Sequence, residues 1–471
     1  MKIDINKYKN LAYLVLLTLV TSCSIDDVQP INQLPAENAI TNATSAQQVL
    51  NSVYDLGREF DLGSFPIYLA AYGNEGVITG FLSGSNGYNT NQVRVGNTFL
   101  ANVYNGHYKI INQSNFLIQE LEAGHAVGLS EVRKVEMISE AKFQRAFSHF
   151  TLLRYFGQFY DLNSNYGIVV KTEFSTELIA LPRNSVQEVY TQIIEDLEYA
   201  EANGPINIAH YYTGSLAARA LLSKVSLYVG DYQRAATLAD EVINNTEGYA
   251  LEANYASIFS NSFNSSEVIF APLTGPDNEG GTTMDQVNRS TFSENLESLS
   301  DAQVGSVGDG DLSATGSGYD PRFSFAYSED TQGNNQNGKY PFLDLVSSQG
   351  NTLYHLRLAE MYLVHAEAEA RRPGGNLTDA LASVNALRFR AGVAVKVLDP
   401  TTILEDIRQE KLLELFFENG EPWFDMVRYA SLGNLDISLE KPTVTSENQY
   451  VLPIPSQVLI GNNNMIQNPG Y

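Results

Sequence analysis

The sequence has one cysteine, one tryptophan and few basic residues. The shortage of cysteine and the shortage of basic residues each exclude whole classes of protein. With Cys23 as its only cysteine, the chain of 471 residues can form no internal disulfide and no cysteine-based zinc finger. It has 29 lysine and arginine residues against 54 aspartate and glutamate residues, which gives a formal net charge of −25. Because a phosphate backbone repels such a chain, we expect no binding to nucleic acid.

The sequence also lacks the motifs of common enzyme classes. It contains no Walker A loop, no G-x-S-x-G elbow and no HExxH helix, and its six histidines show no metal-ligand spacing. The run Asp309–Asp311 is similar to the start of a calcium loop, but the glycine and glutamate that should follow are missing. The many acidic residues single out no carboxylate pair for glycoside hydrolysis. We therefore predict no catalytic residue, no metal site and no cofactor.

Hydrophobic residues make up 44% of the chain, which is enough to bury a sizeable core. The aromatic residues are mainly 27 tyrosines and 22 phenylalanines. Any aromatic recognition surface must therefore be built mostly from tyrosine and phenylalanine.

The amino terminus has the organisation of a secretion signal. Three lysines precede the apolar run Leu11–Val20, which is too short to span a bilayer. The segment Leu19–Cys23 that follows resembles a bacterial lipobox, in which the cysteine becomes the new amino terminus and carries acyl chains. An ordinary signal peptide or a membrane anchor with a chance cysteine is the alternative. We predict a lipoprotein signal peptide over residues 1–22, lipidation of Cys23 and a tether over 23–35.

Cleavage before Cys23 removes three lysines and one aspartate. The mature chain then keeps 26 basic and 53 acidic residues, a net charge of −27. The acidic residues Asp26 and Asp27 resemble the export signal that sends some lipoproteins to the cell surface.

Helical periodicity dominates the rest of the chain. In residues 131–156 the apolar positions repeat every three to five residues, and in 185–200 Ser185 and Glu188 form a capping box. Helix pairs are predicted over 216–229 with 232–243 and over 353–371 with 378–391, and a further helix over 403–417. Residues 227–235 resemble the turn of a tetratricopeptide repeat.

Two glycine-rich regions interrupt this pattern. Residues 61–98 and 272–350 mix glycine with polar and aromatic residues and show no helical period. Unstructured stretches this long in a compact domain are usually functional loops. We therefore expect ligand contacts in both regions.

Several segments together resemble the SusD/RagB family of outer-membrane nutrient-binding lipoproteins. They occur in the family order and span nearly the whole mature chain: Glu140–Gly157, Leu181–Leu197, Leu356–Ala368, Asn385–Gly392, Leu452–Pro455 and Gln467–Tyr471. The chain departs from the family pattern at Lys411, where arginine is usual, and at Glu421–Pro422, where an arginine is common. We expect one buried ion pair of the family to be missing here, because lysine lacks the planar guanidinium group of arginine.

The resemblance implies a mostly α-helical, SusD-like fold, in which tetratricopeptide-like helix pairs support a loop-rich ligand-binding side and there is little β structure. It implies an amino-terminal part over residues 36–250 and a carboxyl-terminal part over 251–471, interleaved in one globular unit. Charged residues within the helical signatures are expected to join packed helices rather than bind ligand, and Trp423 is expected to be structural: Arg145, Arg357, Glu360, Glu367 and Arg388.

The resemblance further implies a cell-surface protein without enzymatic activity. It would sit on the outer membrane over a SusC-like TonB-dependent transporter, capture a glycan or oligosaccharide and act as the lid of the transporter. The charge of −27 suits a neutral or cationic ligand. The alternatives are a lipid-anchored glycoside hydrolase, a tetratricopeptide-type scaffold that binds only protein, and a binder of a peptide nutrient.

Sugar chemistry selects the candidate binding residues within the two glycine-rich regions. Pyranose C–H groups pack on aromatic rings, and sugar hydroxyls pair with amide, carboxylate and guanidinium groups. The first region contributes Tyr72, Asn74, Glu75, Phe81, Asn86 and Tyr88. The second contributes Arg289, Phe292, Tyr319 and Asp320. We expect some of their aromatic rings to face solvent as stacking platforms.

Overall fold

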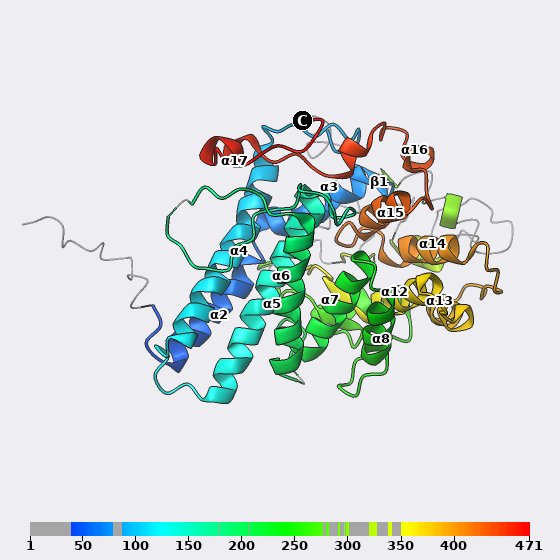
Figure 1. Cartoon of the computed structure of the whole chain (residues 1–471). Helices are drawn as coiled ribbons and strands as arrows, with labels where there is room; N and C mark the ends of the chain where they lie inside the picture. The colour runs from blue at the N-terminus through cyan, green and yellow to red at the C-terminus, as the bar shows by residue number, and fades with distance from the viewer. Residues whose placement is uncertain are drawn as a thin grey trace, which may run out of the picture.

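The computed structural model is mostly helical (Figure 1). It describes residues 39–78, 87–177, 179–206, 208–276, 279–281, 296, 298–300, 320–326, 338–341 and 350–471, together with the backbone of 291–292. This architecture confirms the predicted fold class. Among the described residues, no helix combines the length and the apolar character needed to cross a bilayer.

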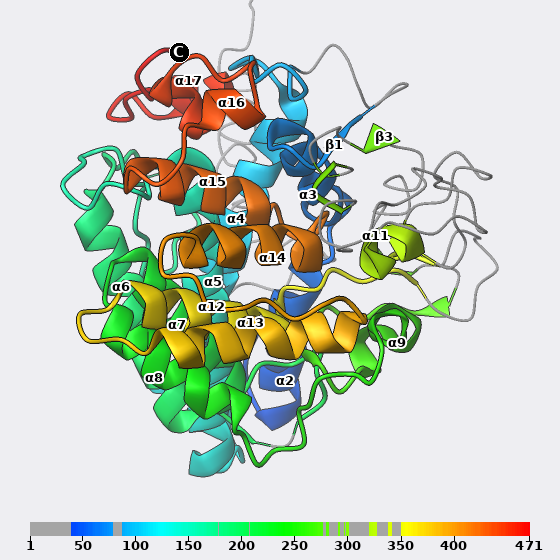
Figure 2. The same ribbon diagram turned by 90° about the vertical axis from the view of Figure 1, so that its right-hand side faces the viewer.

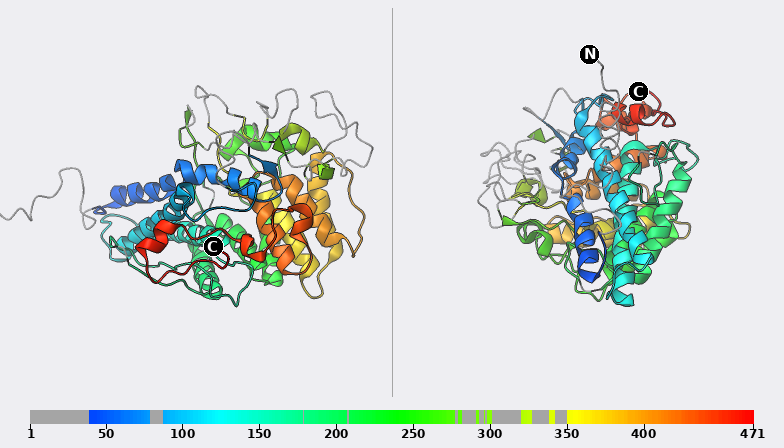
Figure 3. Two further views of the ribbon diagram at one scale, coloured as in Figure 1. Left: turned by 90° about the horizontal axis from the view of Figure 1, so that it is seen from above. Right: turned by 90° about the vertical axis from the view of Figure 1, so that its left-hand side faces the viewer.

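Four helices form the amino-terminal end of the molecule: α2 (Ala43–Leu56), α3 (Phe60–Tyr72), α4 (Thr98–Glu122) and α5 (Glu131–Phe156). Helices α2, α4 and α5 contact one another and lie side by side (Figure 3, right). Polar caps fix where they begin: Asn97 accepts a hydrogen bond from the Leu100 N–H, and Ser130 accepts one from the Arg133 N–H. Helix α5 has the predicted bounds.

The next three helices continue from α5, each packed on the one before: α6 (Val186–Asn203) on α5, α7 (Ser215–Tyr228) on α6 and α8 (Tyr232–Ile243) on α7. The capping box predicted at Ser185 and Glu188 is present. Gly230 turns the chain between α7 and α8 with a φ of +80°, a value that glycine adopts without strain. The predicted tetratricopeptide-like pair is therefore confirmed.

The carboxyl-terminal helices continue the stack: α12 (Leu358–Arg371), α13 (Leu377–Ala391), α14 (Ile403–Leu415) and α15 (Glu421–Ser431). Figure 2 shows α15 above α14, and α14 above the pair formed by α12 and α13. Helix α12 packs against α7 and α8, although more than a hundred residues of chain separate them. Gly392 ends α13 in the left-handed conformation, as predicted.

The predicted start of α12 at residue 353 is wrong. Residues Leu356–Arg357 form strand β4, which pairs antiparallel with β2 (Val268–Phe270). The backbone of these two residues pairs with a strand that is distant in sequence. The helix therefore begins only at Leu358.

Shorter elements complete the described structure: the α-helices α9 (Tyr255–Asn261), α11 (Pro321–Ala326), α16 (Ile437–Glu440) and α17 (Ser456–Gly461), and the 3-10 helices η5 (Ser262–Asn264) and η9 (Glu447–Tyr450). Strand β1 (Gly76–Val77) pairs antiparallel with β3 (Thr291–Phe292). This pairing joins the two glycine-rich regions.

The first glycine-rich region is only partly a loop, which corrects the prediction. Residues 60–72 form helix α3, and nearly all of its side chains are buried against α4 and α15. A helix that is apolar on every side shows no amphipathic period, and this explains why its helical character was missed. Most of the second region, residues 272–350, lies outside the described residues.

The carboxyl terminus is pinned to the end of α5. The Leu452 N–H donates to the Tyr155 carbonyl over 2.8 Å. The side-chain amide of Asn468 donates to the carbonyls of Phe156 and Leu452, over 2.9 and 2.8 Å. These bonds give the terminal segment a structural role.

Candidate binding site

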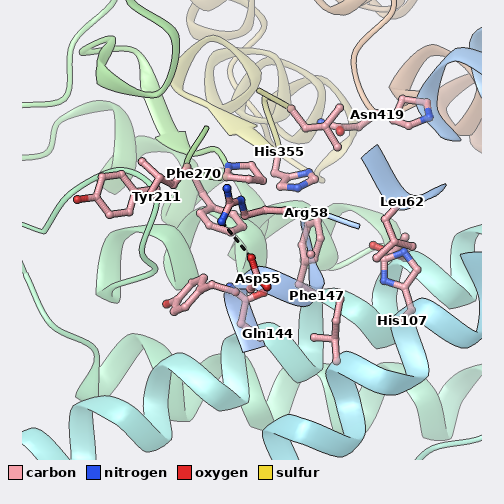
Figure 4. Close-up of a pocket in the computed structure, with 18 of the residues that line it drawn as sticks. Asp55, Arg58, Leu62, His107, Gln144, Phe147, Tyr211, Phe270, His355 and Asn419 are labelled. Atoms are coloured by element: carbon pink, nitrogen blue, oxygen red, sulfur yellow. Dashed lines mark hydrogen bonds and ion pairs between the residues drawn. The ribbon is translucent and has the colours of Figure 1, made fainter. Parts of the chain in front are cut away.

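A pocket of about 430 Å³ opens between the amino-terminal helices and four segments from later in the chain. Helices α2, α3, α4 and α5 contribute one part of its lining, and residues 211–212, 270–273, 353–355 and 419–421 contribute the other. Figure 4 shows Gln144 and Phe147 of α5 together with Phe270 and His355 around the cavity. The volume lies in the lower part of the range of 300–1,000 Å³ that is usual for small-molecule sites.

One face of helix α5 runs along the pocket. Its residues Gln144, Phe147, Thr151 and Arg154 follow one another at intervals of three or four, so they share one side of the helix. With them, His107 of α4 and Glu421 of α15 line the deepest part of the pocket. We call five buried side chains the floor: His107, Gln144, Thr151, Arg154 and Glu421. At the mouth of the pocket, Asn51, Asp55 and Leu273 are exposed.

Aromatic rings form much of the pocket wall. His355 lies between Phe147 and Phe270, with ring centroids 4.9 and 5.4 Å away. Tyr212 contacts the neighbouring Tyr211 at 4.8 Å and Tyr54 of α2 edge to face at 5.1 Å. The wall thus offers apolar ring surfaces of the kind that pack against the C–H groups of a sugar.

Each of the five floor side chains has a buried polar atom without a hydrogen-bond partner in the described part of the chain. Within the described residues, His107 Nδ1, Gln144 Nε2 and Thr151 Oγ1 have no hydrogen-bond partner. Arg154 Nε and Glu421 Oε2 are also unpaired. Buried polar groups of folded proteins are usually paired, so an unpaired cluster that lines a cavity indicates a ligand or ordered water. The residues that carry these unpaired atoms all line the pocket.

The two histidines of the pocket are uncharged at neutral pH. Burial lowers the pKa of His107 to about 3, and the nearby His355 and Arg154 act in the same direction. Burial also lowers the pKa of His355 to about 4, although a hydrogen bond with Asn419 opposes the shift. Neither imidazole therefore brings a positive charge to the pocket under physiological conditions.

The charged residues of the floor neutralise one another. Arg154 Nη1 lies 2.6 Å from Glu421 Oε1, and Lys224 Nζ lies 2.6 Å from the same oxygen. Burial alone would raise the pKa of Glu421, but the charges of Lys224 and Arg154 hold it at about 2. At the mouth, Arg58 bridges Asp55 at 3.0 Å and Glu279 at 2.6 Å (Figure 4). The pocket thus suits an uncharged ligand.

The family models and the relatives that match this chain all point to the same family. Residues 346–471 match the model of the SusD family, and residues 27–227 match a family described as starch-binding and associating with the outer membrane. A SusD-like protein P2 of Formosa agariphila is 25% identical over 99% of this chain and 100% of its own length. A SusD-like protein of Bacteroides ovatus is 25% identical over 70% of this chain and 65% of its own.

The chain belongs to the SusD/RagB family. Solved structures share its fold. A SusD superfamily protein of Bacteroides thetaiotaomicron superposes with a TM-score of 0.75 at 24% identity, covering 91% of this chain and 100% of that protein. A laminarin-binding SusD-like protein superposes with a TM-score of 0.69 at 22% identity, covering 92% of this chain and 100% of its own. The SusD/RagB family is thus one of carbohydrate-binding proteins associated with the outer membrane.

The charged SusD/RagB signature residues join packed helices, as predicted. Arg145 of α5 forms two bonds of 2.8 and 2.6 Å to Asp196 of α6. Each of the others also has a buried ion-pair partner: Arg357 with Glu267, Glu360 with Lys224, Glu367 with Arg428, and Arg388 with Glu410. Trp423 is 2% exposed, which confirms its expected structural role.

The expected loss of a buried ion pair at Lys411 and Glu421 is wrong. Lys411 Nζ lies 2.9 Å from Asp425 Oδ2, and Glu421 pairs with Arg154 and Lys224. Lysine suffices at position 411 because Asp425 comes within reach of a single ammonium group, so no planar fork is needed.

Two of the aromatic candidates of the first region, Tyr72 and Tyr88, do not face solvent. Tyr72 is fully buried, packs against Trp423 and donates a hydrogen bond to the Gln449 carbonyl over 2.7 Å. Tyr88 is 2% exposed and packs 4.9 Å from Tyr68. Both rings belong to the core, because the chain around them folds into α3 and its contacts rather than into an open loop.

Three polar candidates are buried as well. Asn74 is 7% exposed, and Glu75 accepts a hydrogen bond from the Phe417 N–H. Asp320 pairs with Arg322 at 2.8 Å in a fully buried ion pair. These contacts are structural, and burial keeps these three side chains from a ligand at the surface. Phe81, Asn86, Arg289 and Tyr319, like Cys23, lie outside the described residues, and of Phe292 only the backbone is described.

None of the pocket residues was among the predicted binding residues. The sequence carried one usable signal, which is the presence of Gln144 and Thr151 on the same face of α5 as Phe147. Polar residues on an otherwise apolar helix face indicate either a buried partner or a ligand. The other pocket residues come from segments far apart in sequence, and only the fold brings them together.

Proposed function

We propose that this SusD/RagB protein captures a neutral oligosaccharide at the cell surface and delivers it to a SusC-like TonB-dependent transporter, for which it acts as a lid. In this proposal the acylated Cys23 holds the protein on the outer membrane, with residues 23–35 as a tether. The transporter and the lid role follow from the family resemblance, and the ligand class follows from the pocket.

The lining of the pocket is the observation that best supports the proposal. Its walls present the rings of Phe147, Phe270 and Tyr212, and its floor presents unpaired hydrogen-bonding groups. A sugar has both an apolar C–H face and a ring of hydroxyls that donate and accept hydrogen bonds. The uncharged His107 and His355 and the paired floor charges favour a neutral sugar over an anionic one.

The pocket argues against the alternative of a glycoside hydrolase. Hydrolysis needs two carboxyl groups, one of which must hold a proton near neutral pH. The carboxyl groups of the described lining are Asp55, which is paired with Arg58, and Glu421. With a pKa of about 2, Glu421 cannot serve as the proton donor.

The predicted loop contacts stay part of the proposal. Phe81, Asn86, Arg289, Phe292 and Tyr319 are proposed to extend the binding surface beyond the pocket. Pairing of β1 with β3 supports this, because it joins the two regions that contain them.

A glycan array tests the ligand class. The chain from Ser24 onward should bind at least one neutral glycan and release no hydrolysis product from it. Binding to peptides alone, or to no glycan, would overturn the proposal. A protein-interaction scaffold would bind the transporter but no member of the array.

Membrane attachment and the partner are tested in the producing cell. Cys23→Ala should abolish acyl labelling and release the protein from the outer-membrane fraction. An affinity tag on the unaltered protein should recover a TonB-dependent transporter from detergent extracts. Normal acyl labelling of the Cys23→Ala variant would reject the anchor.

A further inference from the structure

We infer that the pocket receives the end of a neutral glycan chain and that the rest of the chain leaves past Tyr212. The inference rests on the proposed function, because it assumes that the ligand is a glycan. The inference adds a mode of binding to the proposed function. In this mode the pocket encloses one terminal sugar and does not bind the interior of a polysaccharide.

The depth of the pocket supports recognition of a chain end. The floor residues are at least nine-tenths buried, whereas Asn51 and Asp55 at the mouth are exposed. Helix α5, which carries Thr151 and Arg154, packs against α4 and α6 on its other sides. A chain passing through its middle would need an opening at both ends.

The polar groups of the floor match a terminal sugar. Gln144 Nε2 and Arg154 Nε are donors, Glu421 Oε2 is an acceptor, and Thr151 Oγ1 serves as either. A terminal sugar has one more free hydroxyl than an internal one, because it takes part in only one glycosidic bond. Each such hydroxyl both donates and accepts, so it can satisfy groups of both kinds.

A second cavity indicates the direction in which the chain leaves. This cavity of about 230 Å³ shares two lining residues, Asn51 and Tyr212, with the first pocket. Arg133 and Glu140 also line it and are paired with each other at 2.9 Å. Tyr212 stands between the two cavities with its ring half-buried, which suits a platform for the second sugar.

The first experiment measures how many protein molecules bind one chain. The probes are oligosaccharides of increasing length from α-1,4-glucan, β-1,3-glucan, β-1,4-mannan and β-1,4-xylan, titrated by calorimetry. For the series that binds, we expect one protein per chain at every length. A ratio that rises with length would overturn the inference while leaving the proposed function intact. If neutral glycans outside these series bind but none of these does, the same titration is made with them. Absence of binding to any glycan overturns both.

The second experiment blocks the two ends of the bound oligosaccharide in turn. Reduction of the reducing end to an alditol, or capping of the non-reducing end, should weaken binding by about tenfold or more in one case only. Equal binding of both modified chains and the parent would contradict end recognition.

The third experiment tests the exit path. Tyr212→Leu should weaken binding of chains of two or more sugars by roughly three- to tenfold and change the affinity for the monosaccharide much less. Tyr232→Leu on α8, away from both cavities, is the matched control. An equal effect of Tyr212→Leu at all lengths would exclude this path.

Discussion

The ring of Tyr72 meets the ring of Trp423 edge to face, with centroids 4.9 Å apart and planes inclined by 85°. Tyr72 ends α3, Trp423 lies in the first turn of α15, and the Tyr72 hydroxyl reaches the Gln449 carbonyl. One side chain thus joins three segments that are distant in sequence. This contact explains why a tyrosine in a glycine-rich region is needed for folding.

Tyr72→Ala should therefore lower the free energy of unfolding by about 3–5 kcal/mol, because it removes a buried ring and leaves a cavity. Tyr72→Phe should cost only about 1 kcal/mol, since it loses one hydrogen bond. Denaturant unfolding measures both. Unchanged stability of Tyr72→Ala, together with lost glycan binding, would restore this ring as a ligand contact.

Glu75 should make stability fall as the pH rises. Burial raises its pKa from 4.5 to about 8, although the hydrogen bond from the Phe417 N–H acts to lower this pKa. Between these values the folded chain keeps a proton that the unfolded chain loses, so Glu75 favours folding at low pH and this contribution is lost toward pH 8. Glu75→Gln should increase the free energy of unfolding by roughly 1–3 kcal/mol at pH 8 and change it little near pH 4.5. A variant less stable at pH 8 than the unaltered chain would contradict the burial of a protonated Glu75.

Ala366 lies where α12 packs against α13 and α14. It is fully buried in a cluster with Ala380 and Val384 of α13 and with Ile403 and Ile407 of α14. Ala366→Leu should overpack this cluster and destabilise the protein by about 1–3 kcal/mol. The exposed Ala382 provides the control, because Ala382→Leu should change stability by less than about 0.5 kcal/mol. Equal melting temperatures for the two variants would argue against this packing.

The affinity for a monosaccharide held in the pocket should not depend on pH between about pH 5.5 and 8. Burial keeps His107 and His355 neutral over this range, with pKa values of about 3 and 4. Calorimetry at both ends of the range measures this directly. A change of affinity centred near the ordinary histidine pKa of 6.5 would show that one of these histidines is charged in the site.

Much of the helical framework could be predicted from the sequence, because its signals are local. The apolar period of α5 and the capping box of α6 gave their positions nearly to the residue. Helix α3 was missed because its apolar residues surround the helix, and the start of α12 was missed because a strand from residues 268–270 pairs with Leu356–Arg357.

The binding site was less accessible to sequence reasoning. Aromatic residues in a glycine-rich segment indicate either a ligand surface or a core contact, and Tyr72 and Tyr88 proved to be core. The pocket takes residues from helices and loops between positions 51 and 421, and no local pattern connects them. Only the folded arrangement of α5 with the four later segments of the lining shows that Gln144 and His355 face one cavity.

The most direct test of the account is the affinity of Gln144→Met for the neutral oligosaccharide that the unaltered chain binds most tightly. Gln144 Nε2 is buried and unpaired, so an unbranched apolar side chain should leave the melting temperature unchanged or raise it. Ser148→Ala is the control, because Ser148 lies on the same helix with an equally unpaired hydroxyl but does not line the pocket. We predict that calorimetry will show roughly three- to tenfold weaker binding for Gln144→Met and no change for Ser148→Ala. Wild-type affinity in Gln144→Met would contradict the assignment of this pocket as the glycan site.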